Sequence, residues 1–156
     1  MTAFTRILLA GAALALAPAA MAAAQECPTA PSFVGVTGPN SDVRASSSRI
    51  DGGDWRVAEH FAREALESRT SSRNKTAAAI NLCAALANQG SADAAEACDD
   101  AVTRGEDRWE AYTNRGAALW LAGDIAAASA DFAAAAEIAS NEDAVSANSA
   151  LAACAA

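Results

Sequence analysis

The stretch that decides the fold is Trp109–Ala139, WEAYTNRGAALWLAGDIAAASADFAAAAEIA. Its pattern indicates two antiparallel helices joined at Gly123 and Asp124. A chain that leaves a helix often needs a positive φ, which glycine adopts at little cost, and the next carboxylate can cap the free amides of the following helix. The second helix then carries an apolar face at spacings of four, three and three residues: Ala128, Phe132, Ala135 and Ile138. We therefore expect a helical hairpin here.

The spacing of small and aromatic residues in this hairpin resembles the tetratricopeptide repeat, a helix-turn-helix unit of about 34 residues. The resemblance rests on these residues: Tyr112, Asn114, Gly116, Gly123, Asp124, Ala128, Phe132 and Ala135. Two positions depart from the usual repeat, because Arg115 stands where leucine is common and Ser140 where proline usually closes the unit. The resemblance extends from Gly52 to Ala156. It implies stacked hairpins whose first helices line a concave surface that binds a partner.

Further copies of the pattern lie in phase with the first. Within Lys75–Arg104, the first-helix residues recur at a shift of 33 and the second-helix residues at 34. The pairs are Asn81 with Asn114, Cys83 with Gly116, Gly90 with Gly123, Ala94 with Ala128, Cys98 with Phe132, and Ala101 with Ala135. Asn148 follows Asn114 by 34 residues, so Asn141–Ala156 is expected to be a final capping helix. The run Gly53–Leu66 resembles a second helix that has no convincing first helix before it.

These observations predict an all-α fold. We expect a short α-solenoid of about 1.5 to 2.5 tetratricopeptide-like units plus a capping helix, preceded by an extended segment. The expected organisation is a signal peptide at 1–24, an extended or loop segment at 25–51 and the helical repeat domain at 52–156. The polar, serine-rich stretch Ser41–Ile50 shows no clear period, and we expect it to be extended or weakly ordered.

The N-terminus has the pattern of a bacterial secretory signal. Arg6 supplies the positive charge, Ile7–Ala17 the apolar stretch, and Ala22–Ala24 the small residues of a cleavage site. The apolar run is too short to span a bilayer, so no stable membrane insertion is expected after cleavage. A periplasmic or secreted location follows. The net charge of −8 disfavours nucleic acid as a partner, because an acidic surface repels phosphates.

Four cysteines in an exported chain are expected to form disulfides, and four cysteines allow three pairings. The repeat alignment favours Cys83–Cys98, because the two matched positions face each other where the helices of one hairpin meet. The remaining pair, Cys27–Cys154, would join the extended N-terminus to the capping helix. Two buried reduced thiols at Cys83 and Cys98 are the alternative.

Catalytic patterns are missing from the sequence, and we expect no enzyme activity, cofactor or metal. The single histidine, His60, has no partnering motif and reads as a surface residue. Zinc sites and redox-active pairs need clustered cysteine or histidine ligands, which the spacing does not provide. Asp93, Glu96 and Asp100 share roughly one helix face, either as a solvated surface or as a docking patch for a basic partner.

The predicted function is that of a non-catalytic scaffold that binds a protein or peptide through its concave face. The resemblance places these residues in the groove: Ile80, Ala84, Asn88, Thr113, Ala117, Trp120 and Leu121. Trp120 either anchors a peptide there or packs beneath the capping helix or the N-terminal segment, and Phe33–Val36 could occupy the groove itself. The alternative function is a structural or self-associating module of an envelope complex, with no peptide groove in use.

Overall fold

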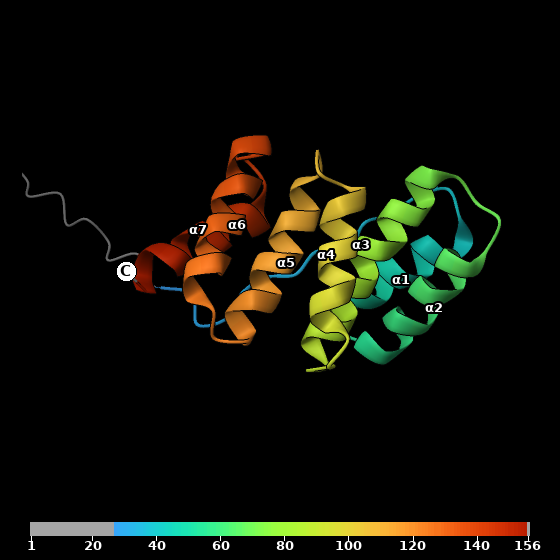
Figure 1. The fold of residues 1–156 in the computed structure, drawn as a ribbon, viewed down its shortest axis with the longest axis horizontal. Helices are drawn as coiled ribbons and strands as arrows, with labels where there is room; N and C mark the ends of the chain where they lie inside the picture. The colour runs from blue at the N-terminus through green and yellow to red at the C-terminus, as the bar shows by residue number, and fades with distance from the viewer. Residues whose placement is uncertain (1–26, 156) are drawn as a thin grey trace, which may run out of the picture.

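The computed structural model describes residues 27–155, and these residues form seven helices and no strand. The expected signal peptide at 1–24 lies outside the described residues. The helices are α1 (Ser41–Asp51), α2 (Trp55–Glu67), α3 (Ser72–Asn88), α4 (Ala94–Arg104), α5 (Trp109–Leu121), α6 (Ile125–Ile138) and α7 (Asp143–Ala155). They pack as three consecutive hairpins with α7 at the end of the stack (Figure 1). The predicted all-α, short solenoid is confirmed.

Glycines with positive φ mark the turn inside each hairpin. The φ angles are 73° at Gly53, 65° at Gly90 and 86° at Gly123. Such angles strain residues that carry a Cβ, so glycine ends the first helix of each hairpin and lets the chain reverse. Asp124 then caps α6 as expected, because its carboxylate accepts the Ala127 N–H at 3.1 Å.

The prediction for Ser41–Ile50 was wrong, because this stretch is helix α1 and pairs with α2. Asn40 caps the helix by accepting the N–H groups of Asp42 and Val43. The buried Ser46 hydroxyl donates to the Ala58 carbonyl of α2 at 2.9 Å. Ser46 thus occupies the small-residue position where α1 and α2 cross, and the backbone of α2 satisfies its hydroxyl group. A helix with serines on its buried face shows no apolar periodicity, which is why the sequence pattern missed it. With α1 present, the first hairpin is complete and helical structure begins at residue 41.

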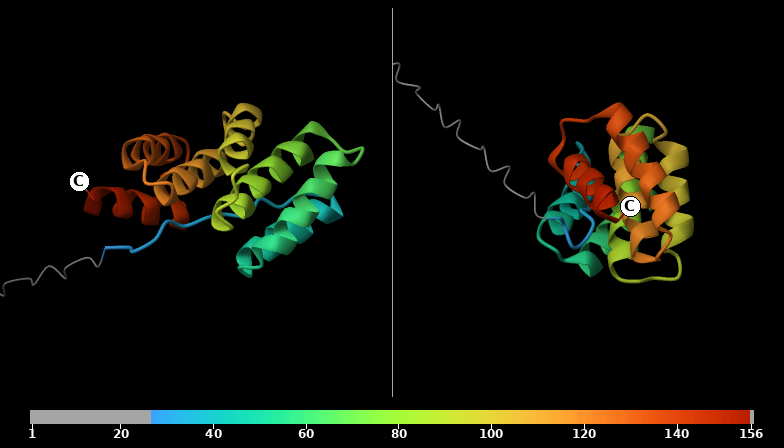
Figure 2. Two further views of the ribbon diagram at one scale, coloured as in Figure 1. Left: turned by 60° about the horizontal axis from the view of Figure 1, so that its bottom comes forward. Right: turned by 90° about the vertical axis from the view of Figure 1, so that its left-hand side faces the viewer.

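The segment preceding α1 is extended, as predicted, and we call residues 27–38 the strap. The strap starts beside the C-terminal end of α7 and runs along one side of the stack towards α1 (Figure 2). It therefore passes the hairpins in the reverse of their order in the sequence. Val36 is buried in the main core cluster together with Val43 and Ile80, so the strap forms part of the folded body.

Both expected disulfides are present. Cys83 of α3 and Cys98 of α4 are bonded inside the main core cluster, and both side chains are buried. Cys27 and Cys154 are bonded at the surface and tie the start of the strap to α7. Much of the remaining core is alanine, which allows helices to approach closely but buries little apolar volume per residue. Two covalent links therefore reinforce a thin core.

Candidate functional site

Three asparagines hold the strap, one from each of α3, α5 and α7. In each case the amide oxygen accepts a hydrogen bond from the N–H of one strap residue, and the amide NH2 donates one to the C=O of the same residue, so that both backbone groups of that residue are paired. The pairs and their two distances are Asn148 with Ser32 (2.7 and 2.9 Å), Asn114 with Val34 (2.9 and 2.9 Å) and Asn81 with Val36 (2.6 and 2.9 Å). We call this set the asparagine ladder.

The ladder binds every second residue of the strap. In an extended chain, alternate residues face opposite sides. One edge of the strap therefore presents the N–H and C=O groups of Ser32, Val34 and Val36 to the amides of α7, α5 and α3. The contacts involve the strap backbone alone, so they recognise an extended conformation and its register.

Besides the buried Val36, the two residues between the ladder-bound ones, Phe33 and Gly35, are restricted by their surroundings. Phe33 packs against two core clusters, one built from α1, α2 and α3 and the other from α5 and α6, and its ring lies edge-on to Trp55 with the centroids 6.1 Å apart. At Gly35, an added Cβ would lie 2.8 Å from both the carbonyl oxygen and the hydroxyl oxygen of Ser47 in α1. Only glycine lets the strap pass this close to α1. The groove thus fits an aromatic residue followed two positions later by glycine.

The ladder asparagines are buried, with exposures of 0% for Asn81, 0% for Asn114 and 1% for Asn148. A buried amide without partners costs free energy, so these side chains require a bound backbone. Asn114 also donates to the Ile80 carbonyl at 3.2 Å, which links successive hairpins. The strap therefore satisfies polar groups that the helices alone would leave unpaired.

The strap covers much of the predicted groove. Ile80 belongs to the cluster that contains Val36, and Ala84 and Ala117 belong to the two clusters against which Phe33 packs. The other predicted groove residues divide by exposure. Thr113 is buried, Asn88 and Trp120 are half-buried, and Leu121 is 53% exposed.

Trp120 lies among elements that meet at the end of the stack. It packs against the cluster of Ala117, Ala128 and Phe132, and its ring centroid is 6.4 Å from that of Phe132. Phe33 of the strap and Ala152 of α7 pack against the same cluster. Trp120 thus shares a core cluster with the N-terminal segment and with the capping helix.

The ladder asparagines were recognised in the sequence only as repeat markers, and their role as strap ligands was missed. The available signal was their recurrence at intervals of 33 and 34 residues on helices rich in alanine. Asparagine has a low helix propensity. Its recurrence at the same position of successive helices therefore indicates that the side chain makes the same kind of hydrogen bond each time.

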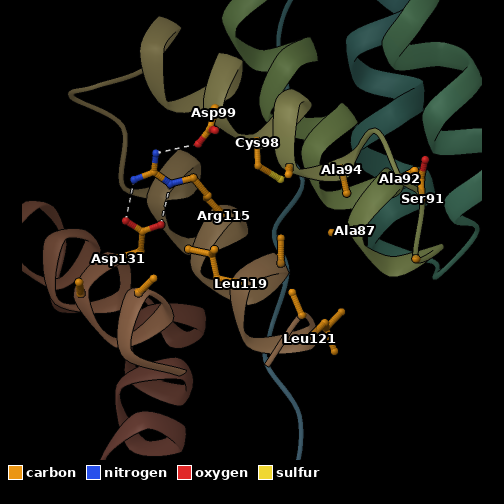
Figure 3. A pocket seen from close by; sticks show the side chains of 16 residues that line it. Ala87, Ser91, Ala92, Ala94, Cys98, Asp99, Arg115, Leu119, Leu121 and Asp131 are labelled. Atoms are coloured by element: carbon orange, nitrogen blue, oxygen red, sulfur yellow. Dashed lines mark hydrogen bonds and ion pairs between the residues drawn. The ribbon is translucent and has the colours of Figure 1, made fainter. Parts of the chain in front are cut away.

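A second concave feature lies between the second and third hairpins, away from the asparagine ladder. It is a cleft of about 590 Å³ with α5 between α4 and α6, and alanines form much of its lining (Figure 3). Leu119 and Leu121 lie in the same cleft. Its volume is within the range of about 300–1,000 Å³ that is common for ligand pockets. We call it the α4–α6 cleft.

Arg115 closes one side of the α4–α6 cleft. Its guanidinium makes two hydrogen bonds to the Asp131 carboxylate, at 2.7 and 2.8 Å, and a third to Asp99 at 3.2 Å (Figure 3). The hydrogen bond to Asp131 raises the pKa of Arg115 against the opposing effect of burial, so the side chain stays charged. Arginine at this position, where the repeat commonly has leucine, cross-links three helices.

The remaining candidate groups lie at or near the surface of the described residues. His60 is exposed, as expected. Asp93, Glu96 and Asp100 share a shallow hollow with Arg63 and Arg104, whereas Asp99 lies in the α4–α6 cleft. Within residues 27–155, no group of three or more histidine, cysteine, aspartate or glutamate side chains is arranged to hold a metal ion.

Comparison of the chain with protein-family models, with curated proteins and with solved structures gave no match. Among the helices described here, none combines the length and apolarity that a membrane crossing requires.

Proposed function

We propose that the chain is a non-catalytic, exported scaffold of the tetratricopeptide-like kind, whose concave face binds one extended segment of a protein. The observation that supports this is the asparagine ladder, in which three buried amides each pair with both backbone groups of one strap residue. Side-chain amides at two-residue intervals suit an extended peptide and few other ligands. The groups that hold the outer half of the strap are the amides of Asn114 and Asn148 and the apolar side chains around Phe33, which supply binding contacts.

In this proposal the strap is the resident occupant of the site, and a partner segment takes the place of its outer half. The inner half is fixed because Val36 is 5% exposed and Gly35 lies tightly against α1. The outer half is bound by Asn148, Asn114 and the Phe33 contacts, and its end is tethered by the exposed Cys27–Cys154 disulfide. Opening this disulfide therefore removes the covalent barrier to exchange. Two disulfides suit export to an oxidising compartment such as the periplasm.

A peptide-exchange measurement tests the proposal. The variant Cys27→Ser/Cys154→Ser with Phe33→Ala has an untethered strap whose outer half is weakened, and a fluorescent peptide of the outer half, residues 28–34 (PTAPSFV), is the probe. We expect the peptide to bind this variant and to bind the disulfide-closed wild type at least about tenfold more weakly, because the tethered strap competes at high effective concentration. Fluorescence anisotropy gives both affinities.

Two controls make the result specific. A peptide in which alanine replaces the phenylalanine should bind more weakly, and Asn114→Ala in the untethered variant should weaken the native peptide. If the untethered variant stays folded by circular dichroism and binds neither peptide, exchange at the concave face is wrong.

The second candidate is a structural or self-associating module whose concave face takes no partner. It is favoured by the burial of Val36 and the covalent tether, both of which integrate the strap into the fold. Static light scattering separates the two candidates, because self-association raises the average mass with concentration. A chain that stays monomeric at high concentration would rule out self-association. Peptide exchange would rule out a permanently closed groove.

A further inference from the structure

The α4–α6 cleft is open to solvent, unlike the concave face that the strap fills. Several of its lining residues are exposed: Ala92, Ala95, Leu121, Ala122 and Ala130. Leu121 is 53% exposed, which makes it one of two large apolar side chains in residues 27–155 that the fold leaves at the surface. An exposed leucine at the edge of an alanine-lined cleft of about 590 Å³ is a typical anchor position for a binding partner.

The walls of this cleft determine the conformation of the segment that fits it. Its lining comes mainly from α4, α5 and α6, whose backbone N–H and C=O groups are bonded within their own helices. Outside the α3–α4 turn at Gly90–Ala92, an extended segment would find few backbone partners there and would lose its bonds to water. A helix satisfies its own backbone and presents only side chains. The cleft therefore suits a helix, in contrast to the concave face and its amide ladder.

Charge determines the composition of that helix. The Asp131 carboxylate is neutralised by two hydrogen bonds from Arg115, but Asp99 receives only one and its side chain is 72% exposed. One guanidinium is thus shared by two carboxylates. Glu96 is also exposed on α4, outside the cleft, and the chain as a whole carries −8, whereas Asp93 lies 4.0 Å from the guanidinium of Arg63. The cleft favours a partner with lysine or arginine beside its apolar stripe.

We propose that the α4–α6 cleft is a second binding site, which takes an amphipathic helix of a partner protein with an apolar stripe flanked by basic residues. The stripe packs on the alanines and on Leu121, and one basic side chain pairs with Asp99. This site is independent of the concave face, so the two proposals fail separately.

The probe is a labelled helical peptide of about 18 residues with leucine on one face and lysine on the other, compared with a glutamate version of the same pattern. We expect the lysine peptide to bind the full wild-type chain at least about tenfold more tightly than the glutamate peptide, with the difference shrinking in high salt. Ala130→Phe fills the cleft without changing charge and should weaken the lysine peptide about tenfold.

Ala133→Phe is the matched control, because Ala133 is also an exposed alanine of α6 but does not line the cleft. It should leave binding unchanged, while Leu121→Ser should weaken it. Circular dichroism and thermal melting confirm that each variant folds. Equal binding by the lysine and glutamate peptides would overturn the proposal. Equal effects of Ala130→Phe and Ala133→Phe would also overturn it, because they would indicate adsorption to an acidic surface.

Discussion

At the residue scale, the asparagine ladder shows how one side-chain type can link a repeat to an extended segment. An amide carries a donor and an acceptor a short distance apart, which matches the N–H and C=O of a single residue in an extended chain. Serine offers one oxygen, and aspartate offers no donor at neutral pH. Only asparagine or the longer glutamine can satisfy both groups. The asparagines at positions 81, 114 and 148 therefore have a physical reason that helix propensity does not supply.

Asn114→Ala should lower the free energy of unfolding by about 2–3 kcal/mol. The substitution leaves the N–H and C=O of Val34 without their partners and also removes the bond to the Ile80 carbonyl. Urea denaturation followed by circular dichroism measures the change. Asn88→Ala is the control, because Asn88 is half-buried and its side chain makes no hydrogen bond within the described residues. A loss at position 114 no larger than at 88 would contradict a supporting role for the ladder.

At the element scale, each hairpin depends on a small residue where its two helices cross. Gly116 of α5 fills this role against Phe132 of α6, and a Cβ added at Gly116 would lie 2.7 Å from the ring. Ser46 serves in the first hairpin through its bond to Ala58, and Cys83 serves in the second through its disulfide to Cys98. A glycine, a hydrogen-bonded serine and a disulfide-bonded cysteine thus each allow the two helices of a hairpin to pack closely. The sequence pattern detected the glycine and the cysteine, but not the serine.

Gly116→Ala should destabilise the chain by about 1–3 kcal/mol, because overpacking forces α5 and α6 apart. Adding Phe132→Leu removes the ring atoms in the way, so the double variant should lose less than the sum of the two single variants. Thermal denaturation of the wild type, the two single variants and the double variant gives the double-mutant cycle.

Gly52→Ala is the glycine control for this cycle. Its added Cβ would meet no atom closer than 3.5 Å, and its φ of −87° suits alanine, so stability should hold or rise. Additive losses for Gly116→Ala and Phe132→Leu would show that the crossing does not depend on this contact.

At the scale of the whole molecule, two disulfides constrain the chain over very different lengths. Cys83–Cys98 spans 15 residues within one hairpin, whereas Cys27–Cys154 spans 127 and joins the two ends of the described chain. The long link holds the strap across three hairpins and α7, which turns a stack of neighbouring contacts into a closed unit. A linear repeat protein normally lacks contacts of this range.

Cys27→Ser/Cys154→Ser should lower the free energy of unfolding by about 5 kcal/mol. Cys83→Ser/Cys98→Ser, which opens the shorter loop, should lower it by about 3 kcal/mol. The physical reason is that a cross-link over a longer loop restricts the unfolded chain more. Denaturant midpoints measure the two losses, and hydrogen exchange should rise first in the strap of the Cys27→Ser/Cys154→Ser variant. If Cys83→Ser/Cys98→Ser instead loses more free energy of unfolding than Cys27→Ser/Cys154→Ser, core packing at Cys83 and Cys98 contributes more than loop closure does.

The sequence by itself determined the second and third hairpins and their glycine turns, because these features depend on local periodicity and on repetition at fixed intervals. The repeat alignment favoured Cys83–Cys98 among the possible pairings and left Cys27–Cys154 as the remaining pair, and the tertiary structure shows both. The sequence did not reveal α1, whose serines replace apolar residues at the crossing. Only the tertiary structure decided what occupies the concave face, since the strap bonds to asparagines 45, 80 and 116 residues away. The asparagines recur at a nearly fixed interval, but nothing in that interval identifies the distant strap as their partner. These contacts arise because an extended backbone and three buried amides each need a hydrogen-bonding partner.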